Sequence, residues 1–183
     1  MIVKILEKNG KKYIVGYHTQ EYRHTGCLDE PILCKYYEAW LGHGYYFWTE
    51  LEFAKFWGED FKKGQTGYYD IYIAHIENSN LLDTVFNREG YEYFVSILEL
   101  TINKIKEYDS SVTLAKVHRF LRDEVWGKEG ITGIIFDDKP SNPSNKNRTY
   151  SAINPLYYKK RVQVGVFDKN IIYNFEIHLE EQS

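Results

Sequence analysis

The order of strand-type and helix-type segments constrains the fold of this chain more than any other feature. Two β-rich runs, residues 2–6 and 13–17, flank Asn9-Gly10, and Asn-Gly is the strongest short-range signal for a β-hairpin. Apolar side chains at helical spacing mark residues 88–107 and 112–126 as two amphipathic helices. Together these segments predict an α+β fold. The other runs with the composition or alternation of strands are residues 45–48, 69–76, 131–136, 162–167 and 171–177.

The segments between these elements carry weaker local signals. Residues 19–36 are polar and irregular, which predicts a loop, with a short helix near residues 31–40. Thr49 is followed three residues later by Glu52, the spacing of a capping box, so we expect a helix over residues 50–57. Turn-rich composition marks two further connections, residues 61–67 and the long polar loop 137–148.

Length and composition indicate a single domain over residues 1–183. A domain of about 150 residues already buries roughly 70% of its unfolded surface in one core. The 17 Tyr, 10 Phe and 4 Trp residues favour strands and flat binding surfaces. With 23 Lys plus Arg against 26 Asp plus Glu, the chain lacks the global positive charge that attracts nucleic acid or an anionic membrane. A local basic patch stays compatible with this balance.

Signals for secretion, membrane insertion and metal binding are absent from the sequence. Charges interrupt every apolar run in residues 1–18, and no segment approaches the roughly 18 apolar residues of a membrane helix. We therefore expect a cytoplasmic protein with no membrane partner. Cys27 and Cys34 do not form a CxxC motif, and no histidine pair stands at metal-binding spacing. Two reduced thiols and no metal are expected.

Three separated segments carry the candidate chemistry. The first is GYHT at residues 16–19, at the expected end of the second strand. The second is GHGYYF at residues 42–47, which leads into the helix expected over 50–57. The third is QVGVFD at residues 163–168, which opens a late strand.

In this order the three segments resemble the ADP-ribosyltransferase superfamily of the diphtheria-toxin and poly(ADP-ribose) polymerase type. The resemblance spans residues 13–175 as a set of short motifs, and the middle helices and the 137–148 loop have no counterpart in it. It implies a split antiparallel β-sandwich with flanking helices and a site that binds NAD as co-substrate, without a metal.

The resemblance also implies roles for individual side chains. His18 would hold the adenosine ribose, in a motif where Thr19 replaces the usual Gly, and Tyr46 would stack on nicotinamide. Gln163 would bond the hydroxyl of the reacting ribose, so His18, Tyr46 and Gln163 form the implied catalytic set. The implied NAD-binding residues are Tyr17, His18, Thr19, Gly44, Tyr46, Trp48 and Ala54.

Gln163 is where the chain departs from the family, which usually has Glu at this point. Breaking the glycosidic bond to nicotinamide develops oxocarbenium character, which an adjacent carboxylate stabilises. An amide keeps the hydrogen bond but lacks the charge, and losing one such partner commonly costs about 10²–10³ in rate. Gln163 therefore implies a slower site, a different acid or base, or an inactivating substitution, and we favour the interpretation that Gln163 is native. Glu50 and Glu52 could replace the carboxylate, but first-turn charges that complement the helix dipole are the favoured interpretation.

The segment before the last strand is where the resemblance places selection of the acceptor. Tyr157, Tyr158 and Arg161 stand there. A cation beside two aromatic rings suits a phosphate-bearing partner with stackable bases, so nucleic acid joins protein as a candidate acceptor. A solvated charge cluster is the structural alternative.

Each candidate site residue also has a structural interpretation. A strand histidine is more often a hydrogen-bonded structural residue than a ligand holder, and Gln163 could simply face solvent. The aromatic run 45–48 is typical of a core, and we expect two of its four side chains to be buried. Tyr46 and Trp48 share one face because side chains alternate along a strand.

The resemblance implies an ADP-ribosyltransferase that modifies an intracellular protein or nucleic acid. Family habits further suggest a toxin or phage-defence effector, with an antitoxin or inhibitor as a candidate partner. Two alternatives stay open. One is a non-enzymatic sensor that binds NAD or ADP-ribose, and the other is a NAD glycohydrolase that uses water as the acceptor.

Overall fold

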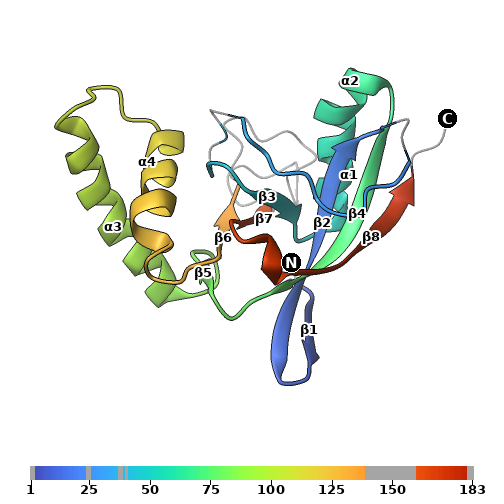
Figure 1. The fold of residues 1–183 in the computed structure, drawn as a ribbon, viewed down its shortest axis with the longest axis horizontal. Coiled ribbons are helices and arrows are strands. Elements are labelled where there is room, and N and C mark those ends of the chain that lie inside the picture. The colour runs from blue at the N-terminus through green and yellow to red at the C-terminus, as the bar shows by residue number, and fades with distance from the viewer. Residues whose placement is uncertain (1–2, 24–25, 37–38, 40, 139–159, 181–183) are drawn as a thin grey trace, which may run out of the picture.

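The computed structural model describes residues 3–23, 26–36, 39, 41–138 and 160–180, and its strands and helices confirm the α+β class (Figure 1). The strands are β1 (Ile5–Lys8), β2 (Lys11–Glu21), β3 (Tyr45–Trp48), β4 (Tyr69–Glu77), β5 (Leu81–Asp83), β6 (Gly133–Asp137), β7 (Val162–Val166) and β8 (Ile172–Glu180). The helices are α1 (Leu51–Trp57), α2 (Lys63–Thr66), α3 (Arg88–Lys106) and α4 (Leu114–Leu121), with π-helical turns at Gly58–Lys62 and Arg122–Trp126 and a 3₁₀ turn at Lys169–Ile171.

The hairpin at the start of the chain forms where Asn9-Gly10 predicts it. Asn9 and Gly10 have φ of 54° and 73°, the left-handed conformations that a tight two-residue hairpin turn requires. β2 then continues through His18 to Glu21 and pairs with β4 along this whole stretch. The predicted loop from residue 19 is therefore wrong at its start, and His18 lies inside a strand. Pairing with β4, a strand distant in sequence whose Tyr69 lies opposite Glu21, holds the polar end of β2 extended.

The sheet nearly separates between β2 and β3. Its strand order is β5-β6-β7-β3-β2-β4-β8, with β1 paired to β2, and β5 and β6 are its parallel pair. β3 shares four residue pairs with β7 but only the pair Tyr17–Trp48 with β2. In Figure 1, α1 and α2 stand beside β2 and β4, whereas α3 and α4 lie at the opposite end of the molecule. Backbone pairing across the sheet is therefore weakest between β2 and β3.

Three clusters of buried apolar side chains hold these parts together. The first lies under the central strands and contains Phe47, which is fully buried. The second packs α3 and α4 against β6 through residues such as Phe94 and Leu121. The third packs α1 against β4 through Phe53 and Ile71. α3 and α4 begin close to their predicted starts, where the caps Asn87 and Thr113 accept backbone N–H bonds.

The short helix predicted near residues 31–40 is wrong for the residues that the structure describes there. Cys34 instead forms an isolated antiparallel bridge with Gly44, with N···O distances of 3.0 and 3.2 Å. Pro31 disfavours a helix here, and the backbone hydrogen bonds between Cys34 and Gly44 hold the backbone extended.

The capping box predicted at Thr49 is also wrong. The Thr49 hydroxyl donates to the carbonyl of Val162 at 3.2 Å, and Glu50 occupies the N-cap position of α1 without a side-chain capping bond. The Thr49 hydroxyl therefore bonds to β7, so it does not cap the helix as the local sequence pattern predicts.

The turn predicted over residues 61–67 is largely helical. Gly58–Lys62 is a π-helical turn that continues into α2, which ends at Gly67 with φ of 88°. Gly58 lets the ring of Tyr69 press against the helix backbone, because a Cβ at Gly58 would lie 2.3 Å from that ring. This packing stabilises a helix that the Lys- and Gly-rich sequence does not favour by itself.

The structure differs from the predicted elements at two further places. β5 was not predicted, because its three residues are too short for a periodic signal. The predicted loop 137–148 starts inside β6 at Asp137, and from residue 139 onward it lies outside the described residues. Among the described helices, none combines the length and apolarity that crossing a bilayer requires.

Gly16 is the position where β2 has no room for a side chain. A Cβ there would lie 2.8 Å from Phe47 Cβ and 2.8 Å from Ile76 Cδ1. Because Phe47 Cβ cannot move without β3, we expect Gly16→Ala to lower the free energy of unfolding by about 1–3 kcal/mol, measured by urea denaturation. Gly64→Ala is the control, since a Cβ at Gly64 meets nothing within 4 Å. A loss no greater than that of the control would contradict this account.

Candidate functional site

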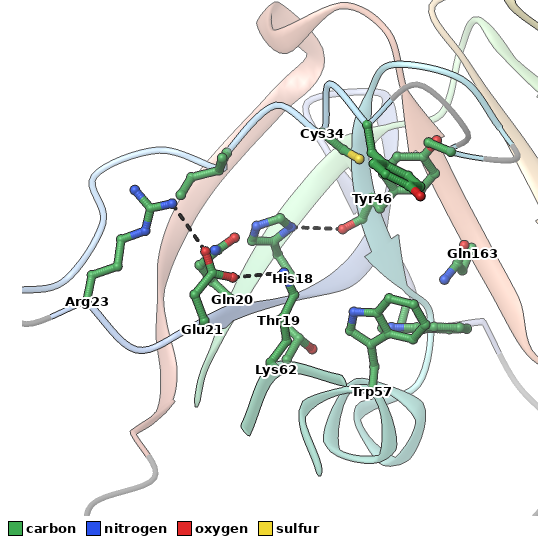
Figure 2. Close-up of a pocket in the computed structure, with 14 residues that line it drawn as sticks. His18, Thr19, Gln20, Glu21, Arg23, Cys34, Tyr46, Trp57, Lys62 and Gln163 are labelled. Atoms are coloured by element: carbon green, nitrogen blue, oxygen red, sulfur yellow. Dashed lines mark hydrogen bonds and ion pairs between the residues drawn. The ribbon is translucent and has the colours of Figure 1, made fainter. Parts of the chain in front are cut away.

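A cavity of about 430 Å³ lies where β2 and β3 diverge, within the range of about 300–1,000 Å³ typical of small-molecule sites (Figure 2). β2 contributes four consecutive side chains to its lining, β3 two and β7 one. From these strands come His18, Thr19, Gln20, Glu21, Tyr46, Trp48 and Gln163, and the other lining residues are Arg23, Ile32, Cys34, Tyr36, Ala39, Trp57 and Lys62.

The side chain of His18 bridges the two diverging strands. Its Nδ1 lies 2.9 Å from the carbonyl oxygen of Tyr46, and since a carbonyl only accepts, Nδ1 carries the proton. Burial lowers the pKa of His18, so the ring is neutral at pH 7 and Nε2 is an acceptor. Nε2 is buried and makes no hydrogen bond of normal geometry among the described residues, although the Gln20 side chain lies close enough to the ring to affect its pKa. A hydroxyl group of a ligand is the kind of donor that Nε2 lacks.

Tyr46 forms a neutral aromatic wall of the cavity. Its hydroxyl donates to the carbonyl of Gly42, and burial raises the pKa of the phenol. The turn that holds Tyr46 is itself fixed, because Arg122 Nη1 donates to the carbonyl of His43 at 2.9 Å and Gly44 bridges to Cys34. The tyrosine ring is thus positioned before any ligand arrives.

Gln163 occupies the centre of the sheet. Its neighbours across the strands are Trp48 on β3 and Phe136 on β6, and its exposed fraction is only 6%. The interpretation of Gln163 as a solvent-facing residue is therefore wrong. Its Oε1 has no hydrogen-bond partner among the described residues. A buried amide oxygen without a partner is costly, and a ligand donor would satisfy it.

Tryptophan rings form the apolar part of the cavity. The ring centroids of Trp48 and Trp57 lie 6.1 Å apart, and Trp57 stacks on Phe61 at 4.1 Å. Both Trp48 and Phe47 are buried, as expected for two members of the aromatic run, and Trp48 and Tyr46 line the cavity from one side of β3. These faces suit a planar heterocycle.

A charged cluster lies at one end of the cavity. Glu21 Oε2 is 2.8 Å from Lys62 Nζ, and Glu21 Oε1 is 3.3 Å from an Nη of Arg23. Burial is the largest single influence and acts to raise the pKa of Glu21, but the hydrogen bonds from Lys62, the backbone and Arg23, together with the charge of Lys62, outweigh it and hold the pKa below its usual value. In Figure 2 this cluster and Gln163 lie on opposite sides of His18.

The predicted catalytic and NAD-binding residues divide into two groups. His18, Thr19, Tyr46, Trp48 and Gln163 line the cavity together, although they come from three separate segments. The residues that lie beside the cavity without lining it are Tyr17, Gly44 and Ala54. The carbonyl oxygen of Ala54 accepts a hydrogen bond from the Thr19 hydroxyl at 2.9 Å, and Tyr17 packs on His178.

The predicted acceptor-binding residues are placed only in part. Tyr157 and Tyr158 lie outside the described residues. Arg161 is not a freely solvated cation: it pairs with Asp138 at 2.8 Å, and its guanidinium lies 5.0 Å from the Trp48 ring centroid. Arg161 thus packs behind one wall of the cavity.

Sequence reasoning missed Glu21, Arg23 and Lys62. Glu21 was assigned to an irregular loop, and only continuation of β2 brings it beside His18. Lys62 was assigned to a turn, and the π-helical turn points it at Glu21. Thr19, Gln20 and Glu21 are three consecutive polar residues, so no alternation of polar and apolar side chains indicates that the strand continues to Glu21.

Neither metal-binding geometry nor known relatives define this site further. In the described part of the chain, no group of three or more His, Cys, Asp or Glu side chains is arranged to hold a metal ion. The chain matches no family model, no curated protein and no solved structure.

Proposed function

We propose that the cavity binds NAD and that the protein is an ADP-ribosyltransferase with a split β-sandwich related to that superfamily. The observation that carries the proposal is the convergence of His18, Tyr46 and Gln163. Three motifs far apart in sequence nominate these residues, and all three line one cavity. The near-separation of the sheet at β2 and β3 agrees with a split sandwich.

The chemistry of the cavity matches the parts of NAD. The lone pair of His18 Nε2 can accept a ribose hydroxyl, and Tyr46 and the tryptophans offer faces for nicotinamide or adenine. Gln163 Oε1 can accept the hydroxyl of the ribose whose glycosidic bond breaks. The acceptor of ADP-ribose is a protein or a nucleic acid, consistent with an effector that acts on macromolecules.

A binding module without turnover is the second candidate, and Gln163 favours it. Among the described residues that line the cavity, Glu21 supplies the single carboxylate, and it is held by Lys62 and Arg23. A site without a free carboxylate can bind NAD while stabilising the oxocarbenium charge poorly.

Loss of NAD binding is the expected result of His18→Ala and Tyr46→Ala. Each removes a contact to the ligand, so we expect a dissociation constant at least about tenfold higher by titration calorimetry. His178→Ala and Tyr108→Ala are matched controls, because both side chains are exposed outside the cavity. Equal affinity in wild type and His18→Ala, with folding verified by thermal melting, would refute this use of the cavity.

Incubation with labelled NAD and separate pools of protein, RNA and DNA tests turnover. Labelled macromolecule together with free nicotinamide supports the transferase. The pool that becomes labelled shows whether the acceptor is protein, RNA or DNA. Free ADP-ribose without labelled macromolecule indicates a glycohydrolase. Binding without nicotinamide release indicates the sensor.

A further inference from the structure

One end of the cavity holds two cations against one carboxylate. Lys62 and Arg23 both contact Glu21, and these three are the charged side chains among the described residues of the lining. The chain as a whole has a formal net charge of −3. We propose that Lys62 and Arg23 bind the phosphate groups of the ligand. In the ligand-free protein the carboxylate of Glu21 occupies the position that the phosphates would take. This inference rests on the proposed function, for which the phosphates are the pyrophosphate of NAD.

The contacts of Glu21 leave Lys62 and Arg23 able to donate further hydrogen bonds. Each carboxylate oxygen reaches one nitrogen, so neither pair has the bidentate geometry of a strong Arg–carboxylate contact. The Arg23 side chain is 47% exposed and Lys62 is 21% exposed, so one cation is accessible to solvent and the other is partly desolvated. A phosphate group brings more charge and more acceptor oxygens than a carboxylate, and it can replace Glu21 on both.

The position of the cluster relative to His18 fits a nucleotide. Glu21 is three residues beyond His18 on β2. Burial is the main cause of the lowered pKa of His18, and Lys62 is close enough for its charge to lower this pKa further. In a dinucleotide each ribose is bonded to the pyrophosphate. A group that binds one ribose hydroxyl therefore has phosphates within a few bonds of it.

Glu21 lies across the cavity from Gln163, so it does not stand in for the missing carboxylate (Figure 2). Glu21 competes with the ligand phosphates for Lys62 and Arg23. Removing its charge should strengthen binding of phosphate-bearing ligands, because the ligand then has no ion pair to displace. A carboxylate that bound a ligand hydroxyl would show the opposite effect.

Titration calorimetry of the full chain with four probes tests the inference. The probes are NAD, ADP-ribose, inorganic pyrophosphate and nicotinamide riboside, which lacks the pyrophosphate of NAD and carries no phosphate. We expect Glu21→Gln to tighten the first three by about two- to fivefold and Lys62→Met to weaken them by about 10- to 100-fold. Nicotinamide riboside should bind all variants alike. Lys63→Met is the matched control, because Lys63 pairs with Glu59 outside the cavity.

The outcomes separate this inference from the proposed function. If NAD binds the wild type but Lys62→Met leaves its affinity unchanged, or Glu21→Gln weakens it, the phosphate site is refuted and NAD binding stands. If pyrophosphate and ADP-ribose bind and respond to the variants but NAD does not bind, the phosphate site stands and the proposed function fails. Absence of binding by every phosphate-bearing probe overturns the phosphate site. Thermal melting of each variant verifies that it is folded.

Discussion

Gln163→Glu is expected to release nicotinamide from NAD about 10²- to 10³-fold faster than the wild-type protein. The substitution keeps the size of the side chain and replaces a neutral amide by a carboxylate. Gln163 Oε1 is buried in the cavity wall without a hydrogen-bond partner among the described residues. A negative charge there would stabilise the oxocarbenium character that develops as the glycosidic bond breaks.

The gain should depend on pH in a defined direction. The introduced carboxyl group would be buried beside Trp48, and burial raises the pKa of a carboxyl group because it disfavours the charged form. Only the ionised form is active, so the advantage over wild type should grow as the pH rises through that pKa. Nicotinamide release measured across pH in both proteins detects this trend.

Two control variants separate charge from shape at residue 163. Gln163→Leu removes the hydrogen bond and adds no charge, and Gln163→Ala removes most of the side chain. Both should release nicotinamide no faster than wild type. If Gln163→Glu binds NAD yet shows no gain at any pH, the missing carboxylate is not what limits the site, and the amide of Gln163 has a role of its own.

Acidification from pH 7 to pH 4 is expected to remove about 3 kcal/mol of stability through His118 alone. The imidazole is fully buried, and neither ring nitrogen has a hydrogen-bond partner among the described residues. Phe94, Trp126 and Phe136 surround it with ring centroids 5.6 to 5.8 Å away. Burial lowers the pKa of His118 to about 4 from an ordinary 6.5.

The sign of the effect follows from which state binds the proton. Between pH 6.5 and pH 4 the unfolded chain protonates His118 and the folded protein does not, so stability falls as the pH falls. The full contribution is present above pH 6.5. A shift of this size corresponds to about 3 kcal/mol, at 1.36 kcal/mol for each pKa unit.

His118→Leu is the variant that isolates this effect. Leucine suits the aromatic surroundings and removes two buried nitrogens without partners, so we expect it to be at least as stable as wild type at pH 7. Urea unfolding from pH 7 to pH 4 should show a loss about 3 kcal/mol smaller than in wild type. His18 also has a lowered pKa and contributes to the remaining slope, which is the same in both proteins. The exposed His178→Leu serves as the control, and parallel pH curves for His118→Leu and wild type would contradict the assignment.

Local sequence signals predicted the elements whose stability is itself local. Asn9-Gly10 adopts the left-handed turn that its residue types favour, and α3 and α4 follow the helical spacing of their apolar side chains. The aromatic run 45–48 forms β3. In these segments turn chemistry and periodicity depend on neighbours in sequence, so the sequence alone was sufficient to predict them.

Predictions were wrong where a distant partner outweighed the local pattern. Pairing with β4 keeps β2 extended past His18, and contact with β7 takes the hydroxyl of Thr49. Packing of Tyr69 on Gly58 makes a helical segment of residues that resemble a turn. None of these partners is visible in the local sequence.

For the candidate site, the sequence by itself determined which side chains could carry chemistry: His18, Tyr46 and Gln163. Only the tertiary structure decided that the three share one cavity, and that Glu21 and Lys62 form its charged end. The reason is physical. Residue type depends on the chain alone, whereas the approach of β2 to β3, and of the turn that ends at Lys62 to β2, depends on long-range pairing and packing.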